Sequence, residues 1–428
     1  MAEKKKELVM VTDSTHRRPT KRLNEDQYHS LVDETETPQK KAKKLVPQQS
    51  DNISFSLPVL PHEIIVEIIS RLPVKTLIQF RCVSKSFKTL ISDTQFIKTH
   101  LRKITSFSKI KKPSLYQKIT PNITFSPFSF FKSCSLYSIF DNSLNDPIEL
   151  NSYFLEKRFQ CDWLVGSCDG LICFSVKQDF VTLLNPSTRV FNRLPNLGFG
   201  RKSGSYSVFG FGYDSEIDDY KVVAVFCFQN KNSSVGFGYE SIVKVCTLRT
   251  NCWRRTGSFG YGVPYDVSGK YVNCTLNWPV MSEGDSGLMW IIVSFDIKRE
   301  TYKEVMQPDY GELVYDRTLG VLDGCLCVMC NYHAVRADFW VMKEYGVRES
   351  WIRLVTVPYL DYPGSLHLQY SVPYAIADNG EVLLEFKSSL VIYNPNYGTF
   401  KYPVINNSCS WVDAEVYIDS LVSPKVEI

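Results

Sequence analysis

Aromatic residues recur at a fixed interval in the second half of the chain. Trp253, Tyr302, Trp351 and Phe400 each lie 49 residues from the next. Each follows a turn-like segment that comes after a short apolar run. A repeat near this length is typical of one four-stranded blade of a kelch-like β-propeller. The interval therefore predicts an all-β, propeller-like domain, with the periodic aromatics in the cores of its blades.

Other segments extend this repeat. Phe191 is a fifth copy, displaced by a Gly-, Ser- and Asn-rich insertion around Asn230 to Gly238. We expect Leu136 to Phe140 and Ala414 to Ile418 to complete a sixth blade together, which would close the ring and remove open sheet edges. A second set of residues supports the repeat. The spacing from Gly269 to Gly324 nearly equals that from Gly324 to Gly380, and each glycine precedes an apolar run. The expected total is about six blades.

Composition limits the class of protein. With 428 residues, of which 44% are apolar and 13% aromatic, the chain is long enough for two folded domains. The basic side chains are concentrated before residue 104, whereas the β region is slightly acidic. A nucleic-acid binder needs a basic face on its folded domain, so we expect no nucleic acid partner. No apolar run is long enough to span a membrane, and the 13 cysteines fit a reducing compartment, so we expect a cytoplasmic and/or nuclear protein.

The first part of the chain differs from the rest. Residues 1–52 contain a single aromatic, Tyr28, and many charged side chains, which predicts a disordered basic leader. Within it, Lys40-Lys41-Ala42-Lys43-Lys44 has the composition of a nuclear-import signal. A solvated run of charge without such a role is the alternative interpretation.

Residues 53–103 have the pattern of a small helical module. Leu60, Ile64, Ile68 and Leu72 recur every four residues and form one apolar helical face. Leu72-Pro73 ends that helix, because proline removes a donor and restricts its predecessor. Apolar residues then continue at spacings of three and four from Leu77 to Ile91. So short a module is near the lower size limit for folding alone, which indicates that part of its apolar surface needs a partner.

The sequence of this module resembles the plant F-box. The segments that carry the resemblance are Leu60-Pro61-x-Glu63, Ile68-Ile69-x-Arg71-Leu72-Pro73-Val74-Lys75-x-Leu77, Phe80-Arg81-Cys82-Val83-Ser84-Lys85-x-Phe87 and Leu90-Ile91. The resemblance implies binding to a Skp-family adaptor and, through it, to the cullin of an SCF ubiquitin ligase. It implies that the contact is made or supported by eleven residues: Leu60, Pro61, Ile64, Ile68, Leu72, Pro73, Leu77, Phe80, Val83, Phe87 and Leu90. Phe87 departs from the family, in which tryptophan is usual. The alternative is a self-contained helical cap on the propeller.

Residues 128–424, after a linker over 104–127, resemble the F-box-associated domain of plant F-box proteins. The resemblance rests on Gly166-Ser167-Cys168-Asp169-Gly170-Leu171-Ile172-Cys173, Leu184-Asn185-Pro186-Ser187-Thr188-Arg189, Phe209-Gly210-Phe211-Gly212-Tyr213-Asp214 and Trp340-Val341-Met342-Lys343-Glu344-Tyr345-Gly346-Val347. It implies that this domain recognises a target protein. Val293-Ser294-Phe295-Asp296 and Met342 to Gly346 also resemble the S-locus F-box proteins of pollen, which recognise secreted ribonucleases.

Catalytic and metal-binding patterns are weak. Gly284-Asp285-Ser286-Gly287 copies a serine protease motif without a matching base, and we interpret it as a turn. Cys325, Cys327, Cys330 and His333 contain zinc-ligand types but lack tetrahedral spacing, since Cys325 and Cys327 alternate along one strand. We therefore expect no catalytic residue, metal or cofactor.

The sequence thus predicts the non-catalytic, substrate-recognition subunit of an SCF ubiquitin ligase. The target-binding residues are unknown, and the loops Phe199 to Ser207 and Asn230 to Tyr239 are the candidates, because propellers bind through loops at one face. The alternative is a propeller interaction module that binds the adaptor without ligase function.

Overall fold

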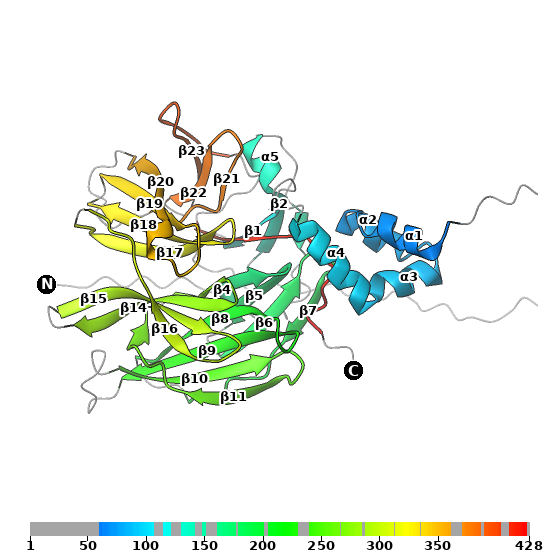
Figure 1. Ribbon diagram of the computed structural model, residues 1–428, viewed down its shortest axis with the longest axis horizontal. Coiled ribbons are helices and arrows are strands. Elements are labelled where there is room, and N and C mark those ends of the chain that lie inside the picture. The colour runs from blue at the N-terminus through cyan, green and yellow to red at the C-terminus, as the bar shows by residue number, and fades with distance from the viewer. Residues whose placement is uncertain are drawn as a thin grey trace, which may run out of the picture. The chain divides into compact units, whose positions relative to one another are not determined.

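The computed structural model describes most of the chain after residue 59. The described residues are 60–106, 114–120, 130–141, 148–150, 161–176, 179–200, 204–229, 239–265, 267–284, 287–311, 313–333, 335–360, 370–386, 389–403 and 411–425. The predicted leader, 1–52, lies outside them. The described residues belong to one compact unit that begins at Leu60. They comprise helices followed by β-sheets (Figure 1).

Four helices open this unit: α1 (His62–Ile69), α2 (Val74–Phe80), α3 (Lys85–Ser92) and α4 (Thr94–Ser106). Pro61 and Pro73 immediately precede α1 and α2, where a missing N–H costs no hydrogen bond. Ser84 caps α3, because its hydroxyl accepts a hydrogen bond from the Phe87 N–H at 3.1 Å. The predicted helix break at Leu72-Pro73 is therefore confirmed.

Five sheets are each built from strands that are consecutive in sequence. The first two contain β4 (Cys161–Cys168), β5 (Leu171–Val176), β6 (Phe180–Asn185) and β7 (Val190–Arg193), then β8 (Tyr206–Asp214), β9 (Asp219–Gln229), β10 (Tyr239–Thr247) and β11 (Cys252–Gly257). The third contains β12 (Val263–Pro264), β13 (Lys270–Val272), β14 (Thr275–Gly284), β15 (Gly287–Asp296) and β16 (Tyr302–Val305). The fourth contains β17 (Asp316–Leu322), β18 (Cys325–Tyr332), β19 (Arg336–Met342) and β20 (Trp351–Pro358), with a 3-10 turn at Arg348–Ser350 before β20. The fifth contains β21 (Ala375–Ile376), β22 (Val382–Phe386), β23 (Ser389–Asn394) and β24 (Thr399–Lys401).

A sixth sheet joins distant parts of the chain. Its order is β25 (Trp411–Tyr417), β1 (Ser114–Thr120), β2 (Phe130–Ser135) and β3 (Ile148–Leu150). The expected use of the Ala414 region as a strand of this sheet is confirmed by its antiparallel pairing with β1. Two expectations were wrong. The predicted linker, 104–127, contains β1, and Leu136 to Phe140 is the helix α5 (Leu136–Phe140).

Both differences arise because these segments pack against residues that are far away in the sequence. In α5, Leu136 and Ile139 are three residues apart and share one helical face, and both are buried against Leu383 and Ile392 of the fifth sheet. The segment 114–120 becomes a strand because β25 and β2 flank it on both sides. Neither neighbour is visible in the local sequence pattern.

The periodic aromatics occupy equivalent places. Phe191, Trp253, Tyr302, Trp351 and Phe400 all lie in the fourth, outer strand of their sheet, opposite a residue of the third strand. Two of them also connect neighbouring sheets. The Trp253 indole N–H donates to the Pro195 carbonyl at 2.7 Å, and that of Trp351 donates to the Met306 carbonyl at 2.9 Å. Each carbonyl acceptor lies in the segment that connects the preceding sheet to the sheet of the tryptophan. The periodic tryptophans therefore also hold these connecting segments in place.

Each of the three regularly spaced glycines precedes a strand, β13, β18 or β22, but for two different physical reasons. Gly324 and Gly380 have φ of 75° and 84° in the turns before β18 and β22, where a left-handed backbone is needed. Gly269 does not lie in such a turn. Its absent Cβ leaves room for the Trp278 indole, since a Cβ at this position would lie 2.4 Å from that ring. The equivalent turn glycine in the first sheet is Gly170, with φ of 80°.

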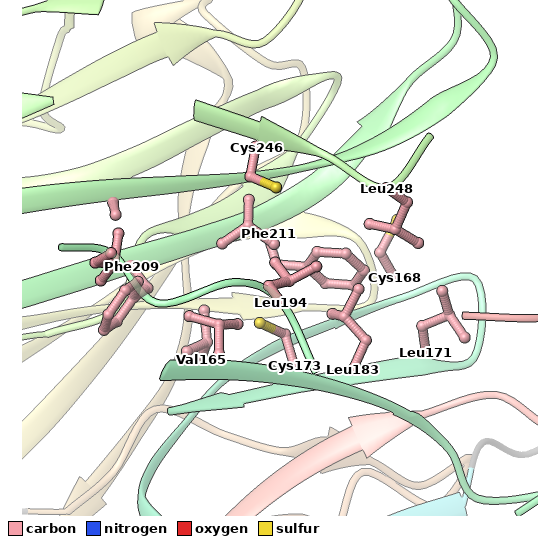
Figure 2. Packing of buried hydrophobic residues seen from close by; sticks show 14 of the residues in the cluster. Val165, Cys168, Leu171, Cys173, Leu183, Leu194, Phe209, Phe211, Cys246 and Leu248 are labelled. Carbon is pink, nitrogen blue, oxygen red and sulfur yellow. The ribbon is translucent and has the colours of Figure 1, made fainter. Parts of the chain in front are cut away.

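Apolar residues of facing sheets form the cores. Figure 2 shows Val165, Leu183 and Leu194 of the first sheet region packed toward Phe209 and Phe211 of the next sheet. Such alternation of sheets and apolar layers allows each sheet to bury both faces.

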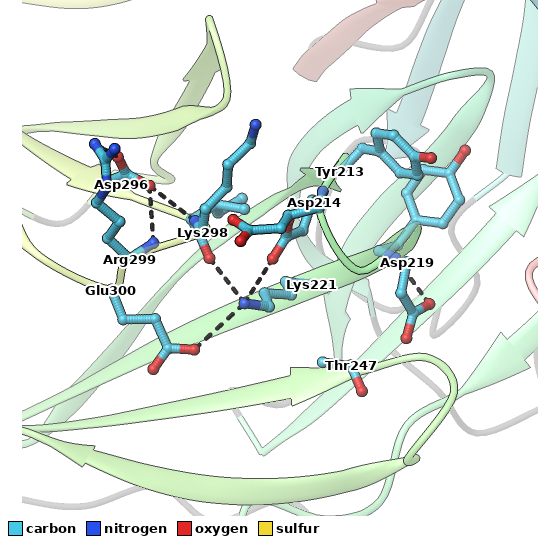
Figure 3. A network of polar contacts seen from close by, with 12 residues as sticks. Tyr213, Asp214, Asp219, Lys221, Thr247, Asp296, Lys298, Arg299 and Glu300 are labelled. Atoms are coloured by element: carbon cyan, nitrogen blue, oxygen red, sulfur yellow. Dashed lines mark hydrogen bonds and ion pairs between the residues drawn. The ribbon is translucent and has the colours of Figure 1, made fainter.

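One buried charge cluster ties the second and third sheets (Figure 3). The Lys221 ammonium lies 2.9 Å from the Asp214 carboxylate and 3.4 Å from that of Glu300, and it donates to the Ile297 carbonyl at 2.8 Å. Arg254 pairs with the same Glu300 at 2.6 Å. Three polar partners compensate the desolvation of the lysine, so the cluster can remain ionised between the sheets.

No helix in the described part of the chain is long and apolar enough to cross a membrane.

Candidate functional site

The apolar face of α1 is open to solvent. Leu60, Ile64 and Ile68 have exposed fractions of 51%, 47% and 50%, although all three are large apolar side chains. Ile64 and Ile68 are four residues apart in α1 and therefore follow one side of the helix, and Leu60 immediately precedes its N-cap, Pro61. Val83, in the turn before α3, is also exposed, as are Pro61 and Pro73. These six predicted site residues keep apolar surface available for a partner.

The other predicted site residues hold the helices together. Leu77 is completely buried, and Leu72, Phe80, Phe87 and Leu90 pack against the same core, which also contains Ile69, Val74, Ile91 and Phe96. The predicted set therefore divides into a solvent-facing group and a supporting group. Phe87, the unusual residue, packs against Phe80 with ring centroids 5.8 Å apart.

Polar contacts fix α1 relative to α4. Glu67 accepts hydrogen bonds from Lys103 at 2.5 Å and from Arg71 at 2.6 Å, and these two cations lower the pKa of Glu67. His100 is buried and its Nε2 lies 2.9 Å from the Leu72 carbonyl oxygen, where the break between α1 and α2 leaves that carbonyl outside a helix. The Leu72 backbone is thus held in place by α4.

The exposed charged side chains of α2 and α3 are basic. Lys75, Lys85 and Lys88 are exposed on α2 and α3. Exposed ammonium groups beside an apolar face favour an acidic partner and mainly accelerate association.

Comparison with known proteins agrees with this arrangement. Residues 57–99 match the model of the F-box domain, and residues 126–401 match the model of the F-box associated beta propeller domain. The chain belongs to the F-box proteins.

The most similar relatives include two Arabidopsis thaliana proteins. The F-box/kelch-repeat protein At3g23880 is 36% identical over 86% of this chain and 97% of its own length. The F-box protein CPR1 is 31% identical over 85% of this chain and 88% of its own length. The family and the two-domain organisation inferred from the sequence are therefore confirmed. Membership of the pollen S-locus subgroup stays a prediction.

The C-terminal segment of the chain completes the F-box core, which the sequence did not indicate. Leu421 is buried among the F-box residues, whereas the adjacent Val422 is buried in the core between the first two sheets. Asn185 holds this segment, because its side-chain amide donates to the Ser420 and Val422 carbonyls at 3.0 and 2.7 Å. The segment also passes over Gly170, where a Cβ would lie 2.6 Å from the Ile418 carbonyl oxygen.

Helix α4 makes the second contact between the F-box and the propeller. Ile97 and Leu101 pack against the core of the first two sheets, and Lys98 pairs with Asp218 in the β8–β9 turn. Hydrogen bonds from Lys98 and Tyr213 lower the pKa of Asp218. The spacing of Phe96, Ile97, His100, Leu101 and Ile104 could have indicated this helix.

The propeller loops nominated from sequence give a mixed result. Residues 201–203 and 230–238 lie outside the described residues. Phe199 stacks on Phe226 with centroids 4.4 Å apart and lies 4.3 Å from the Lys244 ammonium, so its ring takes part in the packing of its own domain. Target binding by these loops stays a prediction.

The cysteines considered as metal ligands are divided between two cores. Cys325 and Cys327 contact the core with Leu322 and Val341, whereas Cys330 packs with Val328 and Met342. Within the described residues no group of three or more metal-ligating side chains converges. Residues 285 and 286 of the protease-like motif lie outside the described residues.

Proposed function

We propose that the chain is the substrate-recognition subunit of an SCF-type ubiquitin ligase. An F-box implies binding to a Skp-type adaptor, which connects it to a cullin. The propeller then holds a target protein, whose lysines are modified by the ubiquitin-charged enzyme that the cullin brings. The chain acts by proximity and supplies no catalytic residue or cofactor to this reaction.

The observation that carries the proposal is the exposed apolar face of α1. An isoleucine that is half exposed gains about 1 kcal/mol when a partner covers the rest of it, and Ile64 and Ile68 are one turn apart on α1, with the exposed Leu60 just before the helix. The helices beneath them are fixed by Leu77 and by the contacts of α4. A rigid apolar face loses little conformational entropy on binding, so most of the gain is available as affinity.

Introducing negative charge on this face provides the test. We expect the double variant Ile64→Glu, Ile68→Glu to lose at least thirtyfold in affinity for a purified Skp-type adaptor, roughly 2 kcal/mol, because two carboxylates would be desolvated in an apolar contact. Both positions are exposed, so the fold should tolerate the change. Calorimetric titration of the full chain measures the affinity.

The matched control is Ile352→Glu, which changes an isoleucine of similar exposure on β20 of the propeller. It should leave the affinity for the adaptor unchanged. Undiminished binding by the α1 double variant would contradict the proposal.

Ligase function needs a separate measurement. In a reconstituted SCF assembly, a bound target should be ubiquitinated by the unaltered chain and not by the α1 double variant. Adaptor binding without modification of any bound target would favour the alternative, an interaction module that uses the F-box without ligase function.

We also propose a cytoplasmic and/or nuclear location, on the basis of the basic segment Lys40 to Lys44 and the abundance of cysteine. Alanine substitution of its four lysines in a fluorescent fusion should lower the nuclear fraction. An unchanged distribution would remove the import signal from the proposal.

A further inference from the structure

The propeller carries a second exposed apolar surface, at the end of the sheets that the F-box does not contact. The surface consists of Leu313, Tyr315, His333 and Val335, and we call it the Leu313 surface. Leu313, Tyr315 and Val335 are 85%, 54% and 69% exposed, and Leu313 is the most exposed of the large apolar side chains in the described part of the chain. The Tyr315 and His333 rings are 5.0 Å apart, so the β16–β17 connection and the β18–β19 turn meet here.

Strand direction places this surface away from the F-box. The F-box and the C-terminal segment contact the turns between first and second strands, at Asp218 and Gly170. First strands of neighbouring sheets run in the same direction, as the parallel bridge between Gly210 and Gly269 shows for two of them. The Leu313 surface precedes the first strand β17 and includes the turn between the second and third strands. It therefore lies at the opposite end.

The backbone that presents these side chains is held firmly. Val314 is buried between its two exposed neighbours, and the Tyr315 N–H donates to the Asn331 carbonyl at 2.9 Å. The start of the connection is fixed by Trp351, which binds the Met306 carbonyl. The Tyr359 N–H donates to the Val335 carbonyl at 3.0 Å. Exposed apolar side chains on a fixed backbone can bind a partner at small entropic cost.

The charges beside the surface are unequally presented. Asp309 and Asp316 are exposed, and each carboxylate accepts a backbone N–H, from Gly311 at 3.0 Å and from Arg317 at 2.6 Å. The neighbouring Arg317 guanidinium instead faces aromatic rings, 4.9 Å from the Tyr310 centroid and 5.8 Å from that of Trp290. Arg336 lies 4.3 Å from the Tyr332 ring and 3.7 Å from the buried Asp338 carboxylate. The connection from Met306 to Asp316 also contains no lysine or arginine in its sequence. The Leu313 surface is thus apolar with an acidic border.

We infer that the Leu313 surface is where the propeller binds its target, and that the bound segment of the target combines apolar anchors with lysine or arginine. This inference rests on the proposed function, because it specifies the class of target. Aliphatic and aromatic anchors would cover Leu313, Tyr315 and Val335, while cationic side chains would pair with Asp309 and Asp316. Lysines close to such a segment would also be available for ubiquitination.

Selection from a displayed library of random linear peptides tests the inference. The full chain is held by an affinity tag, so the outcome does not depend on adaptor binding, and failure here is distinguishable from failure of the proposed function. We expect selected peptides to combine lysine or arginine with leucine, phenylalanine or tryptophan. Their affinity, measured by fluorescence polarisation, should fall as salt is raised.

Variants assign the binding to the surface. Leu313→Ser with Val335→Ser should weaken the selected peptides at least tenfold, and Asp309→Asn with Asp316→Asn should weaken them and reduce the salt dependence. Tyr397→Ser is the control, because Tyr397 is equally prominent but lies in the β23–β24 turn at the other end of the sheets. Selection of acidic or uncharged peptides, no selection at all, or binding that the Leu313 and Val335 variant leaves unchanged would each overturn the inference.

Discussion

The F-box and the propeller bury their apolar residues in different ways. Every residue of β5 is buried, because the strand is covered by sheets on both faces. In α1, only Ile69 is fully buried among five apolar positions, and the helix leaves an apolar side to solvent. A ring of sheets supplies its own neighbours, whereas four short helices do not enclose a core by themselves. The F-box core accordingly includes Leu421 of the C-terminal segment, and the exposed face of α1 is left for another protein.

The largest effect should come from the centre of the F-box. Leu77 is completely buried, so Leu77→Ala would open a cavity in the small core of the helices. It should lower the free energy of unfolding of the helices by about 2–5 kcal/mol. Ile68→Ala, on the exposed side, should cost far less. Hydrogen exchange of the α1–α3 amides measures both. Equal costs would show that α1 is covered on both sides and would break the comparison.

A smaller effect should come from Leu421, the residue of the C-terminal segment that lies in the F-box core. Leu421→Ala should destabilise the helices by about 2 kcal/mol, at the lower end for a buried leucine, because one side of its site can relax. Amides of β14 and β15 should exchange at unchanged rates. If the sheets and helices were destabilised together, the two regions would form one cooperative unit and the distinction between them would fail. Leu313→Ala, which removes an exposed leucine, is the control.

Within the propeller, the periodic tryptophans should contribute individually small amounts. Trp351→Phe removes the hydrogen bond to the Met306 carbonyl and should cost about 1 kcal/mol beyond the loss of ring area. Trp340→Phe is a suitable control, since its buried Nε1 has no partner in the described part of the chain. Denaturant midpoints of the two variants should therefore differ. A larger cost for Trp340→Phe would contradict the role assigned to the periodic residue.

The smallest effect is expected at the ion pair between the two regions. Lys98→Met should cost less than about 1 kcal/mol at neutral pH, because the pair with Asp218 is exposed. The pKa of Asp218 is lowered in the folded chain, so the contribution is present above its unfolded pKa and is lost as the pH falls through the folded pKa. Stability of the variant and of the unaltered chain should converge in acid. A difference that persisted there would exclude this carboxylate as its source, and Lys88→Met serves as the matched surface control.

Local chemistry explains what could be predicted from the sequence. The outer strands were found from Trp253, Tyr302, Trp351 and Phe400, because a turn followed by an aromatic is repeated within each sheet. The glycines that precede the strands serve two purposes, a left-handed turn at Gly324 and close approach to an indole at Gly269. Spacing alone does not separate these purposes.

Contacts between distant segments explain what could not be predicted. Strand β1 pairs with β25, which lies far away in the sequence, and Leu421 joins a core formed by residues from Ile65 to Ile104. The F-box residues could be identified from their sequence motif, yet only the structure separates the exposed Ile64 and Ile68 from the buried Leu77. Periodicity identifies an apolar face without showing which part of it is already covered.

The most direct test of the exposed α1 face is methyl NMR of the full chain labelled at isoleucine. On addition of a Skp-type adaptor, the Ile64 and Ile68 methyl signals should shift or broaden, whereas those of buried Ile91 and of exposed Ile352 on the propeller should not. Methyl signals of Ile64 and Ile68 that remain unchanged at saturating adaptor would contradict the account.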